Sequence, residues 1–108
     1  MDKIALAQLG NFAVIQQVAQ EIAALLGPRR IYLYSQKLNC QGDVTSFKLC
    51  VVGDFADKQK AEQSLHWEID SQLPFDVLLY TPQEWEELSA TPHTFACHIQ
   101  KTGIIVYE

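Results

Sequence analysis

Short apolar runs alternate with segments of helical periodicity along this chain, and this alternation restricts the folds that it can adopt. A helical stripe covers residues 3–26, and apolar runs at 31–35 and 46–52 predict two strands. Helical spacing returns over 56–72, and a third apolar run follows at 75–81. Strands that alternate with helices after a two-strand start predict a mixed sheet in an α/β or α+β domain.

Glycine and proline mark where these elements begin and end. Gly27-Pro28 ends the first helix, and the polar segment 36–43 with Gly42 predicts a loop. Thr81-Pro82 is typical of a helix start, and Thr91-Pro92 repeats the signal before a last helix. The apolar ending GIIVYE predicts a closing strand. We therefore expect a single domain over residues 1–108, with a small mixed sheet and helices packed mainly on one face.

Composition narrows the function classes. The chain has 108 residues, of which 48% are apolar, so one real core can form. It has no apolar run long enough to span a bilayer, and its start has no signal-peptide pattern, which predicts a cytoplasmic protein that does not bind membranes. The net charge is -5 and the basic residues are scattered, which argues against nucleic-acid binding.

The cysteines and histidines offer weak site candidates. Cys40, Cys50 and Cys97 are expected to be reduced, with Cys50 a small core residue inside an apolar strand. On a helix, His93 and Cys97 would share a face near His98, but a zinc site needs three or four ligands and no second half is visible. A helix surface or a sheet-packing role is favoured over metal binding. Cys40 is more simply a loop residue than a nucleophile.

Two aromatic positions leave alternatives open. Trp67 lies off the stripe formed by Ala61, Leu65 and Ile69, so it is either exposed at an interface or part of a wide apolar face, and the wide face is favoured. The first helix also carries more apolar surface than one small sheet needs, which would suit a homodimer.

The second strand raises the question of function. In TSFKLCVV (45–52), Ser46 and Lys48 are two residues apart and therefore point to the same face. Two carboxylates at that spacing would indicate a metal site. A hydroxyl and an ammonium group do not.

Four segments carry a resemblance that addresses this question. In order they are YLYSQKLNCQG, SFKLCVV, PFDVLLYTPQEW and IQKTGIIVYE, and they fall within residues 28–108. Together they resemble the small nucleotidyltransferases of the polymerase-beta superfamily. In that family the first strand leads into a Gly-Ser turn, the second opens with Asp-x-Asp, and the third carries one more aspartate.

This chain departs from the family pattern at the residues that matter most. Ser35 and Gln36 stand at the Gly-Ser position, and Ser46 and Lys48 stand at the two aspartate positions. Asp76 alone retains its carboxylate. Mg²⁺ prefers a shell of oxygen ligands, whereas lysine has no acceptor and carries a positive charge. Glycine also lets backbone N–H groups approach a phosphate closely, and Ser35-Gln36 lacks it.

The resemblance and its departures imply a catalytically inactive nucleotidyltransferase-like domain that acts as a protein-binding or regulatory module, with no cofactor and no bound metal. Its expected partner is a second copy or a small all-helical protein, because small members of the family often pair with one. We also expect Lys48 to replace the metal electrostatically and to pair with Asp76.

Three further interpretations remain open. The chain could be an active nucleotidyltransferase that uses unusual ligands around Asp76, with Mg²⁺ and a nucleoside triphosphate. It could instead be a structural α+β domain unrelated to the family. If the sheet is ordered as in the family, Tyr32 and Tyr34 share the face of Lys48, where they either stack a base or fill the former cleft.

Overall fold

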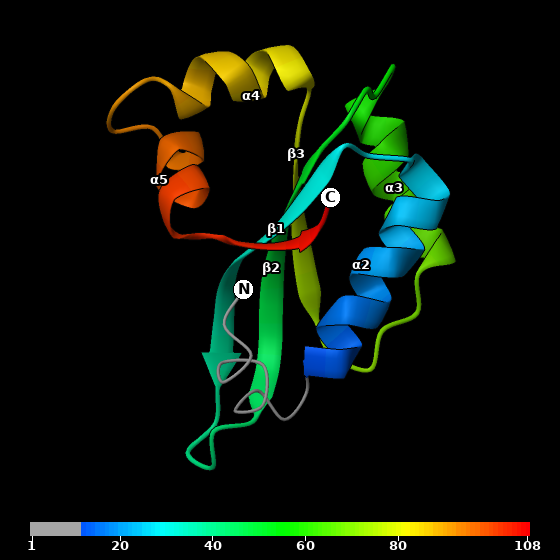
Figure 1. Cartoon of the computed structure of the whole chain (residues 1–108). Helices are drawn as coiled ribbons and strands as arrows, with labels where there is room; N and C mark the ends of the chain where they lie inside the picture. Colours follow the sequence, from blue (N-terminus) through cyan, green and yellow to red (C-terminus); the bar gives the residue numbers. More distant parts are fainter. Residues whose placement is uncertain (1–11) are drawn as a thin grey trace.

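A computed structural model describes residues 12–108, and in this range a central sheet has helices on both of its faces (Figure 1). Its elements follow the chain as α2 (Phe12–Leu26), β1 (Arg30–Leu38), β2 (Val44–Val52), α3 (Lys58–Glu68), β3 (Phe75–Tyr80), α4 (Pro82–Ser89), α5 (Phe95–Thr102) and β4 (Ile104–Tyr107). The part of the predicted first helix before residue 12 lies outside the described residues.

The sheet has four strands in the order β3-β2-β1-β4. The central strand β1 runs antiparallel to both β2 and β4, whereas β2 and β3 run parallel. Parallel neighbours need a crossover, and α3 supplies it between β2 and β3. The expectation of an α+β fold with a small mixed sheet is confirmed.

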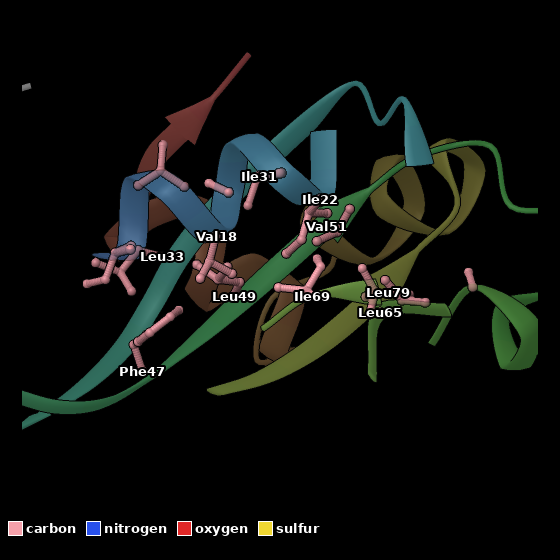
Figure 2. Packing of buried hydrophobic residues seen from close by; sticks show 14 of the residues in the cluster. Val18, Ile22, Ile31, Leu33, Phe47, Leu49, Val51, Leu65, Ile69 and Leu79 are labelled. Carbon is pink, nitrogen blue, oxygen red and sulfur yellow. The ribbon is translucent and has the colours of Figure 1, made fainter. Parts of the chain in front are cut away.

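The larger core lies between one face of the sheet and the helices α2 and α3. The predicted stripe of α2 places Ile15, Val18 and Ile22 against this face, where each is at most 1% exposed. Alternate residues of β2, including Leu49 and Val51, point into the same layer (Figure 2). The apolar residues that repeat every 3.6 positions in the helix and every 2 positions in the strand thus pack together in one core.

A second, smaller core covers part of the opposite face. Here Tyr32 and Cys50 from the sheet pack with Trp85 of α4 and with Ala96 and Ile99 of α5. The two longer helices therefore cover one face, and two helices of eight residues each add a partial layer on the other. Cys50 is fully buried, as its place in an apolar strand predicts.

Side-chain caps fix where the helices begin. The Asp57 side chain accepts hydrogen bonds from the backbone N–H groups of Gln59 and Lys60, so α3 begins at Lys58. Thr81 and Glu84 form a reciprocal capping box at α4, with Pro82 in the first turn, as the sequence predicts. The predicted helix over 56–72 is too long, because Ile69 has extended backbone angles and ends α3 after Glu68.

The last helix starts later than its proline signal indicates. Thr94 caps α5 by accepting a hydrogen bond from the backbone N–H of Cys97, and the helix begins at Phe95. Thr91 instead closes α4, where its side chain donates to the carbonyl of Glu87. His93 has a φ of 68°, which no helical residue adopts. The segment around Thr91-Pro92 is therefore a turn between α4 and α5.

The loop predicted over 36–43 is shorter in the structure. Gln36 and Lys37 continue β1 and pair with Phe47 and Ser46 in β2, so the connection narrows to a hairpin turn. The Asn39 side chain organises this turn by accepting hydrogen bonds from the N–H groups of Gln41 and Asp43. A polar segment in the sequence is therefore compatible with paired strands that have one solvated face as well as with a loop.

Over the described range, no helix has the length and apolar character needed to cross a membrane.

Candidate functional site

A bulge in β1 brings Tyr34 and Ser35 to the same place on the sheet. The register passes from Leu33 opposite Leu49 directly to Ser35 opposite Lys48, so Tyr34 is the extra residue. Such a bulge turns both of its side chains toward the face of the residue opposite. Ser35 therefore lies across the strand pair from Lys48, on the face that carries α4 and α5.

The parallel pair β2 and β3 adds the carboxylate. Lys48 lies directly opposite Asp76 in register, and Ser46 precedes it by two residues on the same face. Both charged residues are exposed, and Ser46 is half-buried. Ser35, Ser46, Lys48 and Asp76 thus converge from three adjacent strands on one open area, which we call the Lys48 face.

Gln36 does not belong to this group. It pairs with Phe47, which points into the larger core, so Gln36 faces the α2 and α3 side of the sheet. Its Oε1 atom is buried and has no hydrogen-bond partner in the described structure. Ser35 and Gln36 continue an ordinary strand here, and neither forms part of a tight turn.

The expected ion pair between Lys48 and Asp76 is not formed, although their juxtaposition is. The ion pairs within residues 12–108 are Arg29 with Asp54, Arg30 with Glu108, and Lys58 with Glu84. Both groups of the expected pair are well exposed, and water competes effectively for such charges. The ammonium group and the carboxylate therefore gain little from direct contact.

Burial and nearby negative charge act together on the tyrosine beside this face. Burial raises the pKa of Tyr34, and the potentials of Cys50 and Asp76 raise it further. Burial also raises the pKa of the Cys50 thiol to about 12. Tyr34 and Cys50 are accordingly uncharged at neutral pH, and Cys50 is no nucleophile in this state.

Aromatic contacts close the end of this face that α4 and α5 cover. Trp85 lies 5.1 Å from Tyr32 and 5.5 Å from Tyr80, measured between ring centroids. Phe95 meets Tyr34 edge to face at 5.3 Å, yet it stays 52% exposed. Tyr32 is 2% exposed and packs in the second core, so it cannot stack a base. Tyr34 and Phe95 form the rim of the Lys48 face.

The histidine and cysteine candidates are not brought together. His93 precedes α5, so it does not share a helical face with Cys97, which is buried. Cys40 is exposed in the hairpin turn between β1 and β2. No group of three or more histidine, cysteine or acidic residues within residues 12–108 is placed to hold a metal ion.

Trp67 is 86% exposed, so the prediction that it belongs to a wide apolar face of α3 is wrong.

A groove that the sequence did not indicate lies at the other end of β2 and β3. It has a volume of about 700 Å³ and is lined by Arg29, Asp54, Phe55, Ala56, Thr81, Pro82, Gln83 and Glu86. Crevices beyond the carboxyl ends of parallel strands are common ligand sites. In the sequence, only the polar residues that follow β2 and β3 could have indicated this groove. The order of strands in the sheet is needed to show that the loops after β2 and β3 lie side by side.

The chain matches no protein-family model, no curated protein and no solved structure.

Proposed function

We propose that this chain is a nucleotidyltransferase-like domain without metal-dependent catalysis, which serves as a protein-binding or regulatory module. One observation carries the proposal: Lys48 lies directly opposite Asp76, with Ser46 on the same face. These positions correspond, in the family that the chain resembles, to the three carboxylates that hold the metal ions. The positions converge as a metal site would need, but the side chains have the wrong chemistry.

The donor set does not fit a divalent cation. Asp76 supplies one carboxylate, Ser46 supplies a neutral hydroxyl, and the Lys48 ammonium group supplies no acceptor. Two unit charges 4 Å apart interact by about 4 kcal/mol at an effective dielectric constant of about 20, and a dication doubles that repulsion. One carboxylate at the same distance cannot offset the repulsion and also replace the missing ligands.

The phosphate-binding half of such a site is altered as well. Ser35 and Gln36 stand where the family has its Gly-Ser turn, and here they continue β1 in ladder register with β2. Their side chains point to opposite faces of the sheet. A strand in this arrangement does not offer the exposed cluster of backbone N–H groups that holds a phosphate.

The open Lys48 face supports a role in binding a protein. Lys48 and Asp76 are exposed, and Phe95 adds apolar surface at the rim. Aromatic residues are enriched in protein interfaces and polar groups occupy the rim, so Phe95 would lie in such an interface with the two charged residues at its edge. The resemblance adds a small all-helical protein to the partners that we propose for this face.

Restoring the family residues tests this proposal. The variant Ser35→Gly/Gln36→Ser/Ser46→Asp/Lys48→Asp should gain Mg²⁺-dependent binding of a nucleoside triphosphate in calorimetry, since it returns the ligands to a retained arrangement. The control Lys60→Asp/Gln63→Asp on α3 should gain none, although it changes the net charge by the same amount as the substitutions at 46 and 48. Binding by neither protein, with both folded, would count against descent from a nucleotidyltransferase site.

A further inference from the structure

The two edges of the sheet are protected to different degrees. At one edge, β4 has only four residues, and the neighbouring β1 carries a bulge and Lys37. At the other edge, β3 has six residues, FDVLLY, which pair with β2 without any register shift. This strand contains no lysine, arginine or proline. Short strands, bulges and charged residues are the usual protection against edge pairing, and β3 has one exposed carboxylate only.

The backbone of β3 has unused hydrogen-bonding groups at this edge. Phe47 N–H donates to the Pro74 carbonyl, and Gly53 N–H donates to the Tyr80 carbonyl. Because strand residues alternate in direction, the even-numbered residues of β3 bond to β2. Phe75, Val77 and Leu79 therefore direct their N–H and C=O groups outward, where β3 has no neighbouring strand in the described part of the chain.

We propose that β3 pairs antiparallel with β3 of a second copy, about a two-fold axis at Val77. In this register Val77 faces Val77, and Phe75 faces Leu79 of the other copy. Each outward residue then both donates and accepts a backbone hydrogen bond. The two sheets join into one continuous sheet, with a row of apolar side chains on the α3 side.

The flank of α3 beside this edge is also self-complementary. Glu62 and His66 lie one helical turn apart, and with Leu65 they line a hollow against Phe75, Asp76 and Val77 at the edge. A two-fold axis at Val77 sets the two α3 helices antiparallel and brings Glu62 toward His66 of the second copy. Complementary groups on one flank favour a second copy over an unrelated strand.

This dimer has a consequence for the Lys48 face, although it does not depend on the proposed function. Asp76 lies on the same strand as Val77, with its side chain on the opposite side of the sheet from α3. Pairing through β3 therefore places the Lys48 faces of both copies side by side on one surface. A partner protein would meet two such faces together.

A proline at the axis tests the pairing. Val77→Pro removes an outward N–H group and leaves the hydrogen bonds to β2 in place, whereas Val77→Ala shortens the side chain and keeps the N–H. In light scattering after size exclusion, the natural chain and Val77→Ala should have twice the 12.2 kDa mass of one chain. Val77→Pro should have the mass of one chain. A dimeric proline variant, or a natural chain that stays monomeric at its highest soluble concentration, would overturn the proposal.

Hydrogen exchange of the natural chain decides the matter if the proline variant does not fold. In the dimer, the amides of Phe75, Val77 and Leu79 should exchange slowly, and dilution to the monomer should release them. A dimer in which these three amides exchange as fast as in the monomer would place the interface elsewhere.

Discussion

Lys48 and Asp76 lie directly opposite each other on the parallel strands β2 and β3, and yet they form no ion pair. The strand register fixes their juxtaposition, whereas solvent determines whether their charged groups meet. Their position is therefore a property of the fold, and we expect their interaction to contribute little to its stability.

A double-mutant cycle measures that contribution. We expect Lys48→Met, Asp76→Asn and the double variant to give a coupling energy below about 0.5 kcal/mol in urea unfolding, because exposed charges interact weakly. A coupling above about 1.5 kcal/mol would mean that the two groups are held together in solution.

The strand that carries Lys48 also anchors the larger core. Leu49 is fully buried between the sheet and α2, so Leu49→Ala should lower the free energy of unfolding by about 2–5 kcal/mol. Leu38 is 51% exposed near the hairpin turn, and Leu38→Ala should cost less than about 1 kcal/mol. Similar losses for the two variants in urea denaturation would contradict this assignment of the core.

Thiol reactivity should separate the three cysteines. Cys40 is exposed, whereas Cys50 and Cys97 are buried and burial raises the pKa of Cys50 to about 12. Iodoacetamide at mildly alkaline pH should therefore modify Cys40 first, and the other two only after unfolding. Peptide mass spectrometry reads the order directly, and early labelling of Cys50 would show that the second core opens readily.

Acid should weaken the start of α4. The hydrogen bond from Lys58, followed by the bond from the backbone N–H of Thr81, lowers the pKa of Glu84 below its ordinary value of 4.5. A lowered pKa adds stability above pH 4.5 that is lost as pH falls through the value in the folded chain. The difference in unfolding free energy between the natural chain and Glu84→Gln should therefore be largest near neutral pH and vanish in acid. A difference that stays constant with pH would show that the charge of Glu84 plays no part.

The sequence predicts the elements well because its periodic patterns report burial directly. Helix α2, the strands β2 and β3, and the capping box at Thr81 all follow from local signals, since each depends on neighbours in the chain. The late start of α5 does not follow, because Thr91 and Thr94 are both good caps. In the structure Thr91 bonds back to the Glu87 carbonyl, and Thr94 caps the N–H of Cys97.

The candidate site also combines features that local sequence patterns predict with features that they do not. Alternation along β2 predicts that Ser46 and Lys48 share a face, but only the bulge at Tyr34 brings Ser35 to that face. Gln36 faces away because the strand continues where a turn was expected. The edge of β3 depends on strand order, which no local pattern contains.

Calorimetry with a nucleoside triphosphate, in the presence and absence of Mg²⁺, tests the central claim most directly on the natural chain. We predict no Mg²⁺-dependent heat of binding at millimolar ligand, because Lys48 lies beside the carboxylate that a metal ion would need. Binding tighter than about millimolar that requires Mg²⁺ and is lost in Asp76→Asn would contradict the account and show a working nucleotidyltransferase site.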